Sequence, residues 1–288
     1  MRYAKVVIIL SISLFLIGSA IYFSNAVNGR PASTVVHRSF FVEQEFFDLA
    51  YTRNTPPAPE GMVRGGIIPH HLIASHVIAE FFQGIESVQS PEVIVLIGPD
   101  HLNRSDYHIA TSVGSWYTPY GILYPHTPII ESMAADGVVT IDESLFDVEH
   151  SITSEVAFIR RSFPRASIVP ITIQQHTSAE ELTQLGDWLA QRLPENSLVL
   201  VSVDFAHNVN HRQAMLQNAA SIELLKTMDP ETTKGIYVDS PASLSVLFHY
   251  LHERRVGHVQ ILDSLDTVDV TGDTSIPAVT SYITAYFW

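Results

Sequence analysis

The sequence contains no cysteine, and this absence excludes several kinds of chemistry at once. Disulfide bonds, cysteine-based zinc sites, thiol nucleophiles and the usual ligation of iron–sulfur clusters all require a thiol. Cysteine usage therefore gives no information about the redox compartment. Any metal ion must be bound by histidine, aspartate or glutamate side chains.

Basic residues are also scarce. The 288 residues include 16 Lys and Arg against 30 Asp and Glu, so the formal net charge is −14. Because proteins bind nucleic acids largely through Lys and Arg that neutralise phosphates, we expect no nucleic-acid partner.

Hydrophobic residues make up 46% of the chain, which is enough to bury one sizeable core. We therefore expect one large α/β domain.

Charged residues are absent from the first long apolar run, which extends over residues 6–23. Arg2 and Lys5 precede this run, and its length is close to the ~20 residues of a membrane-spanning helix. The run favours an uncleaved transmembrane signal anchor, while small residues such as Gly18-Ser19-Ala20 leave a cleaved signal peptide open. Both interpretations make the membrane a partner through the N-terminal segment and place the domain on the extracytoplasmic side.

The chain then divides into three parts on this interpretation. We expect residues 1–27 to form the anchor or signal peptide, residues 28–34 a short linker, and residues 35–288 the α/β domain. In that domain, short Val- and Ile-rich runs alternate with longer amphipathic stretches. This alternation predicts a single three-layer αβα domain with a mostly parallel or mixed sheet.

Three buried strands and six helices stand out in the pattern. The strands are predicted at Val93–Ile97, Ile168–Ile173 and Leu198–Val203. The helices are predicted at Ile73–Gln83, Thr127–Ala135, His150–Ser162, Ser178–Arg192, Arg212–Met228 and Ser240–Arg254. Ser178 followed by Glu181 predicts a capping box at the start of one of these helices.

Histidines follow two of these strands and a further short strand that is predicted to end at Ile67-Ile68. Ile67-Ile68 leads into His70 and His71, Leu96-Ile97 leads into His101, and Ser202-Val203 leads into Asp204 and His207. Ligands of open α/β sheets gather beyond the carboxyl ends of the strands, so we expect these side chains to meet. Two histidines and one carboxylate suit non-haem Fe(II) or a catalytic zinc ion.

Five ordered motifs resemble those of the Memo family, which includes protein B of the AmmeMemoRadiSam system. They are Ile67-Ile68-Pro69-His70, Leu96-Ile97-Gly98-Pro99-Asp100-His101, Ser115-Trp116-Tyr117-Thr118-Pro119-Tyr120-Gly121, Val148-Glu149-His150-Ser151-Ile152 and Val201-Ser202-Val203-Asp204-Phe205-Ala206-His207. The family shares its fold with class III extradiol dioxygenases, whose iron is bound by two histidines and one carboxylate. The resemblance therefore implies an extradiol dioxygenase-like fold with one metal site.

Carried over by motif, the resemblance makes His70 and His101 metal ligands and places Asp204 and His207 beside the open coordination position. Some Memo proteins use a cysteine as the third ligand, at a position that aligns with Asp239 here. Asp239 can complete a two-histidine, one-carboxylate set, and it can equally serve as the N-cap of the following helix.

Other assignments also stay open at this stage. His207 is predicted to act as a general base or proton shuttle whose tautomer Asp204 fixes, or the two residues close a turn structurally. His150 is a catalytic candidate that points into the cleft or faces solvent, and His71 can exchange roles with His70. The aromatic residues around Trp116 either wall a cleft or pack in the core.

Three functions compete on this evidence. The first is an Fe(II)-dependent, dioxygenase-like oxidoreductase, and the second is a zinc-dependent hydrolase. The third is a non-catalytic metal-binding or assembly protein, because fold alone does not fix chemistry. We expect one divalent metal ion, Fe(II) or Zn, and an unidentified small molecule as the binding partner.

Overall fold

Runs of Val, Ile and Leu form the centre of the main β-sheet in the computed structural model, which describes residues 35–52 and 58–288. Strand β3 (Val93–Pro99) lies between β9 (Ser197–Ser202) and β8 (Ser167–Ile173) and is parallel to both. Strand β2 (Gly65–Ile68) is parallel to β9 on its other side. These strands are buried on both faces, which explains their continuous apolar sequences.

Antiparallel strands extend this parallel centre on both sides. Among the described residues, the order in the large sheet is β10-β12-β2-β9-β3-β8-β4-β7, with β11 also paired to β12. A smaller sheet has the order β1-β5-β6. The remaining strands are β1 (Val36–Arg38), β4 (Ile109–Thr111), β5 (Ser115–Thr118), β6 (Gly121–Leu123), β7 (Thr140–Ile141), β10 (His207–Val209), β11 (Val259–Asp266) and β12 (Val279–Phe287).

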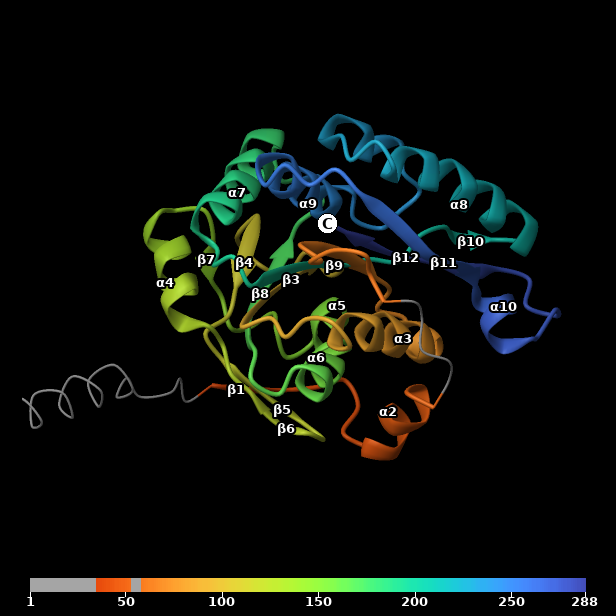
Figure 1. Cartoon of the computed structure of the whole chain (residues 1–288), viewed down its shortest axis with the longest axis horizontal. Helices are drawn as coiled ribbons and strands as arrows, with labels where there is room; N and C mark the ends of the chain where they lie inside the picture. Colours follow the sequence, from red (N-terminus) through yellow and green to blue (C-terminus); the bar gives the residue numbers. More distant parts are fainter. Residues whose placement is uncertain (1–34, 53–57) are drawn as a thin grey trace, which may run out of the picture. The chain divides into compact units, whose positions relative to one another are not determined.

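Helices cover both faces of the large sheet, so the domain has three layers (Figure 1). One core lies between the sheet and α4, α7 and α9, and the other lies between the sheet and α2, α3 and α6. The helices are α2 (Gln44–Ala50), α3 (Ser75–Glu86), α4 (Thr127–Ala135), α5 (His150–Thr153), α6 (Val156–Ser162), α7 (Ala179–Arg192), α8 (His211–Leu225), α9 (Pro241–Glu253) and α10 (Thr267–Thr271). Within the described ranges, 3-10 helices also span Leu72–Ala74 and Pro230–Gly235. The predicted αβα architecture with a mixed sheet is confirmed.

Most helices begin where the sequence predicts them. The capping box of α7 is present: the Ser178 hydroxyl accepts from the backbone N–H of Glu181, and the Glu181 carboxylate accepts from the N–H of Ser178. One prediction was wrong, because the helix expected over His150–Ser162 is two helices, α5 and α6, separated by Ser154 and Glu155. Thr and Ser are weak helix formers, and they occupy this junction.

The predicted membrane segment requires a correction. None of the helices in residues 35–52 and 58–288 is both long enough and apolar enough to cross a lipid bilayer. The apolar run 6–23 and the linker 28–34 lie outside the described residues. The predictions that rested on the length and hydropathy of that run were a transmembrane or signal anchor, a membrane partner and an extracytoplasmic location. No helix of the described residues supports these three predictions, so they are not retained.

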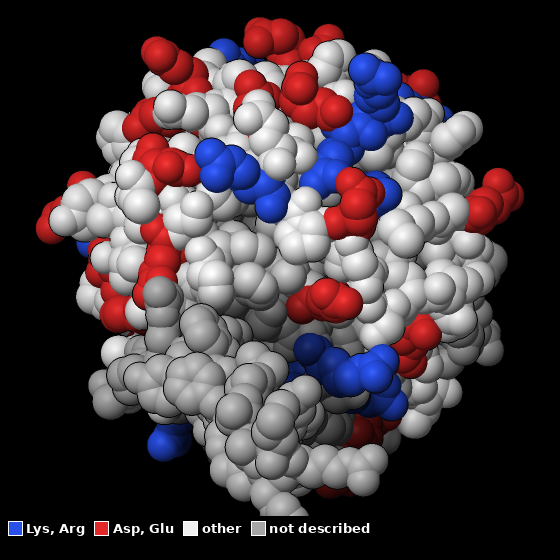
Figure 2. All heavy atoms as spheres, turned by 60° about the vertical axis from the view of Figure 1, so that its left-hand side comes forward, with Lys and Arg blue, Asp and Glu red and all other residues white. Residues whose placement is uncertain are grey.

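Charged side chains of both signs share the surface of the domain. Figure 2 shows one face, on which Lys and Arg occur in small groups among Asp and Glu. The basic groups on this face do not merge into a continuous patch. This distribution agrees with the excess of acidic residues in the sequence.

Candidate metal centre

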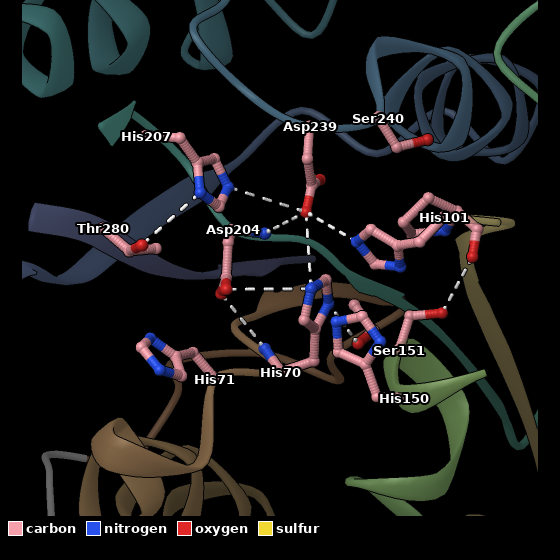
Figure 3. Close-up of polar contacts among 12 residues, drawn as sticks. His70, His71, His101, His150, Ser151, Asp204, His207, Asp239, Ser240 and Thr280 are labelled. Atoms are coloured by element: carbon pink, nitrogen blue, oxygen red, sulfur yellow. Dashed lines mark hydrogen bonds and ion pairs between the residues drawn. The ribbon is translucent and has the colours of Figure 1, made fainter. Parts of the chain in front are cut away.

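The candidate site forms where the carboxyl ends of three neighbouring strands meet. Strands β2, β9 and β3 are adjacent and parallel, so the residues that follow them come together at one edge of the sheet. His70 follows β2, His101 follows β3, and Asp204 follows β9. Figure 3 shows these side chains gathered around the carboxylate of Asp239.

Two histidines approach the same oxygen of Asp239. The Nε2 atoms of His70 and His101 lie 3.4 Å and 3.7 Å from Asp239 Oδ2. His207 Nε2 lies 4.0 Å from that oxygen, so it borders the cluster at a longer distance. The structure therefore brings together the residues that the sequence predicts as metal ligands, His70, His101 and Asp239.

A third imidazole also belongs to the cluster. Ligand atoms of His70, His101 and His150 all lie within 4.8 Å of one another, which makes the three a group able to hold a metal ion. The His150 ring stacks on that of His101 at 4.1 Å, and the His70 ring is perpendicular to both. His150 thus points into the site, and its distance fits a ligand as well as the catalytic role predicted for it.

Asp239 is held in place by the segment that follows β9. Its backbone N–H donates to the carbonyl of Asp204, and the N–H of Asp204 donates to Asp239 Oδ2 at 3.1 Å. An isolated antiparallel bridge between Phe205 and Val238 supports this pairing. The N-cap of α9 is Ser240, whose hydroxyl accepts from the N–H of Ser243, so Asp239 does not have the capping role considered for it.

The donor atoms fit a divalent metal ion. Imidazole nitrogens and a carboxylate oxygen suit Fe(II) and Zn alike. Asp239 Oδ1 is buried and has no hydrogen-bond partner in the described part of the chain. Leaving a buried carboxylate oxygen without a partner costs free energy, so a bound metal ion or ligand that contacts this oxygen would remove that cost.

Glu149 orients His101 from behind. The Glu149 side chain is fully buried, and its Oε1 accepts from His101 Nδ1 at 2.8 Å and from the Ser151 N–H at 2.9 Å. Its Oε2 accepts from the His101 backbone N–H at 3.0 Å. With Nδ1 engaged, Nε2 is the nitrogen that His101 presents to the site. Glu149 lies in the motif Val148-Glu149-His150-Ser151-Ile152, but no sequence pattern indicates that it supports His101.

Burial and neighbouring charges shift the pKa of each histidine differently. Burial lowers the pKa of His70, which favours the neutral form of its imidazole, the form that binds a metal. Burial lowers the pKa of His150 to about 4, and the nearby imidazoles of His70 and His101 act in the same direction. Burial would also lower the pKa of His101, but Asp239 and Glu149 raise it to about 10.

Asp204 contacts His70 directly. Its Oδ1 accepts from the His70 backbone N–H at 3.2 Å, and its Oδ2 lies 3.7 Å from His70 Nε2. Burial and the charge of Asp239 raise the pKa of Asp204 to about 7. Among the described contacts, the partner of His207 Nδ1 is the hydroxyl of Thr280 at 3.4 Å, which differs from the predicted pairing of His207 with Asp204.

The contacts of His71 and of the aromatic residues around Trp116 show whether these side chains reach the site. His71 Nδ1 lies 2.7 Å from the hydroxyl of Tyr282, so His71 is turned away from the cluster. Trp116 is fully buried and packs on His37, with ring centroids 4.8 Å apart. Neither Trp116 nor Tyr117 lines the cavities beside the site; Trp116 packs in the core, and Tyr117 is half-exposed.

Two cavities border the cluster. A cleft of about 890 Å³ is lined by His70, His150, Asp204 and His207 on the side of the metal candidates. A second cavity of about 500 Å³ reaches His101 and Asp239. A ligand in either cavity can therefore approach the cluster.

A family model and individual relatives both relate this chain to the Memo-like proteins. The family model for Memo-like proteins matches residues 44–285. A MEMO1 family protein of Metallosphaera sedula is 27% identical over 177 residues, 59% of this chain and 62% of that protein. One from Thermococcus onnurineus is 28% identical over 157 residues, 51% of this chain and 54% of that protein. The chain thus spans less than two thirds of the length of these relatives.

A solved structure supports the fold independently. The structure of an uncharacterized protein of Escherichia coli K12 aligns with this chain over 77% of this chain and 99% of that protein, with a TM-score of 0.51 and 14% sequence identity. Identity this low supports the fold alone. The family model covers most of the chain and includes every candidate ligand. The chain belongs to the family of Memo-like proteins.

Proposed function

We propose that this chain is a mononuclear Fe(II)-dependent oxidoreductase in which His70, His101 and Asp239 bind the ion. The observation that carries the proposal is the convergence of both His Nε2 atoms on Asp239 Oδ2, at 3.4 Å and 3.7 Å. Two histidines and one carboxylate leave coordination positions open for reactants. The adjoining cavities give small molecules access to that position.

The protein supplies positioning and proton handling in this proposal. Bound Fe(II) would contribute redox and Lewis-acid chemistry. Glu149 holds the His101 ring in the orientation that presents Nε2. In this proposal His207 Nε2 takes a proton from a molecule in the cleft or returns one, a role supported by its partial exposure at the cleft and its distance of 4.0 Å from Asp239 Oδ2. Asp204 is buried and holds the backbone of His70.

Zinc-dependent hydrolysis is the second candidate, and one observation favours it. His70, His101 and His150 form a three-imidazole group, and three histidines are a known ligand set of catalytic zinc. A non-catalytic metal-binding role is the third candidate, and open access from two cavities weighs against it.

Oxygen consumption by the metal-loaded full chain tests the proposal. The Fe(II)-loaded protein should consume oxygen in the presence of at least one member of a panel of catechols and related phenols, and the Zn-loaded protein should not. His207→Ala should lower turnover while Fe(II) binding stays unchanged. Ester hydrolysis by the Zn-loaded protein, with no oxygen consumption by the Fe(II)-loaded protein, would replace the first candidate by the second.

A further inference from the structure

Apolar side chains wall the larger cleft, called here the apolar cleft and bounded by Phe40, Phe41, Phe46, Leu72, Ile73 and Val148. Its polar floor is the cluster of His70, His150, Asp204 and His207, in which His70 and Asp204 are buried while His150 and His207 are half-exposed. The cleft therefore changes character along its depth, from an apolar mouth to a polar end beside the metal candidates. A volume of about 890 Å³ is large enough for a ligand of substantial size.

The mouth of the apolar cleft exposes large hydrophobic side chains. Phe40 is 56% exposed, Phe41 37%, Ile73 46% and Val148 45%. Single exposed apolar residues are common, but a contiguous apolar rim around a cavity typically marks a binding surface. These four side chains come from three separate parts of the chain and converge on one opening. Covering them with an apolar molecule would remove apolar surface from water.

The aromatic wall is held in place by backbone hydrogen bonds. The N–H of Phe40 donates to the carbonyl of Thr153 at 2.9 Å, and the N–H of Ser39 donates to the carbonyl of Tyr117 at 3.0 Å. Phe41 contacts Phe40 edge-on at 5.2 Å between ring centroids. Because Thr153 ends the helix that begins at His150, this bond fixes the aromatic wall beside the candidate metal cluster.

The second cavity offers a contrasting environment. Polar and charged side chains such as Asp100, Glu231, Lys234 and Ser240 contribute to its lining. A wholly polar molecule would be better solvated there than between the phenyl rings of the apolar cleft. The two cavities thus separate apolar from polar ligands on either side of one cluster.

We propose that the apolar cleft binds a molecule with a large apolar body and a polar, metal-coordinating head, and that Phe40, Phe41 and Ile73 select this body. The inference rests on the proposed function for the role of the head, and it extends that function by naming the class of substrate. The apolar body lies along the aromatic wall, and the head reaches the polar floor at His70 and His150.

Three hydroxamates that share one metal-binding head test the proposal. Acetohydroxamate, benzohydroxamate and octanohydroxamate are titrated by calorimetry into the full chain, both metal-free and loaded with Zn. Octanohydroxamate should bind the loaded protein about tenfold or more tightly than acetohydroxamate, since each buried methylene adds to affinity. Phe40→Ala/Phe41→Ala and Ile73→Ser should each reduce this preference at least several-fold.

Leu49→Ala is the matched control, because Leu49 is an exposed apolar residue of the neighbouring helix α2 that does not line the cleft. It should leave the preference unchanged, and thermal unfolding of every variant checks the fold. Equal affinity for all three hydroxamates, or an unchanged preference in both the aromatic and the Ile73 variants, would overturn the inference. Affinities that are the same with and without metal, while the preference for octanohydroxamate persists, would instead reject the metal site and keep the apolar one.

Discussion

Replacing Glu149 by glutamine should weaken metal binding without touching a proposed ligand. Both oxygens of Glu149 accept hydrogen bonds, from His101 Nδ1, the His101 N–H and the Ser151 N–H. In Glu149→Gln one oxygen becomes an NH₂ group, which cannot accept from any of these donors. The His101 ring then loses part of the support that fixes its orientation and basicity.

The expected magnitude follows from the geometry. Removing a hydrogen-bonding group behind a metal-bound histidine typically weakens metal affinity about 10- to 100-fold, which corresponds to about 1.4–2.7 kcal/mol. The burial of Glu149 and its three hydrogen bonds favour the upper part of that range. The assay is competition between the full chain and a chelating dye for Fe(II) and for Zn.

Glu181→Gln is the control for this experiment. Glu181 also contacts a histidine, His108, at 3.0 Å, but both side chains are exposed, with Glu181 in the first turn of α7 and His108 just before β4. Its substitution should leave metal affinity unchanged. If Glu149→Gln remains folded and binds metal as tightly as the wild type, the role given to Glu149 is incorrect.

Three further predictions concern stability. The carboxylates of Glu143 and Asp147 raise the pKa of His37 in the folded protein despite its burial. The stability that the charged imidazole adds should therefore be complete below pH 6.5 and should decline as the pH rises through the higher folded pKa. In urea unfolding at several pH values, His37→Gln should flatten this dependence. Gly98→Ala would place a Cβ 2.6 Å from the Cβ of Ser151 and should cost about 1–3 kcal/mol in denaturant unfolding. Ser178→Ala removes the capping box and should cost about 1 kcal/mol, lowering Tm by about 2–4 °C in calorimetry.

The centre of the fold was predictable from local sequence. Strands such as β3 and β8 are continuous apolar runs because both of their faces are buried, and this pattern is visible without a structure. Helix α4 has the predicted bounds, Thr127–Ala135, because a proline marks its first turn.

The antiparallel edge was not predictable in the same way. Strand β12 pairs with β2 through Ala285 and Ile67, which are separated by most of the domain. Strands β10 and β11 then pair with β12. Such pairings depend on distant partners and on total burial, and a short apolar run does not specify them.

The site was predictable in part for the same physical reason. His70 and His101 follow strands that are separated by β9 alone, so the topology of the sheet brings them together. The approach of Asp239 depends on the bridge between Phe205 and Val238, which no local pattern indicates. The direction of the His150 ring and the aromatic wall at Phe40 likewise follow from tertiary packing, although a cluster of phenylalanines near residue 40 was visible in the sequence.

Metal content of the purified full chain tests the central claim most directly. Mass spectrometry after loading with Fe(II) or Zn should find near-stoichiometric metal in the wild type and little in His70→Ala and His101→Ala. His71→Ala should retain the metal, because His71 is adjacent in sequence but turned towards Tyr282. Equal metal in all four proteins, or none in the wild type under any loading condition, would contradict the account.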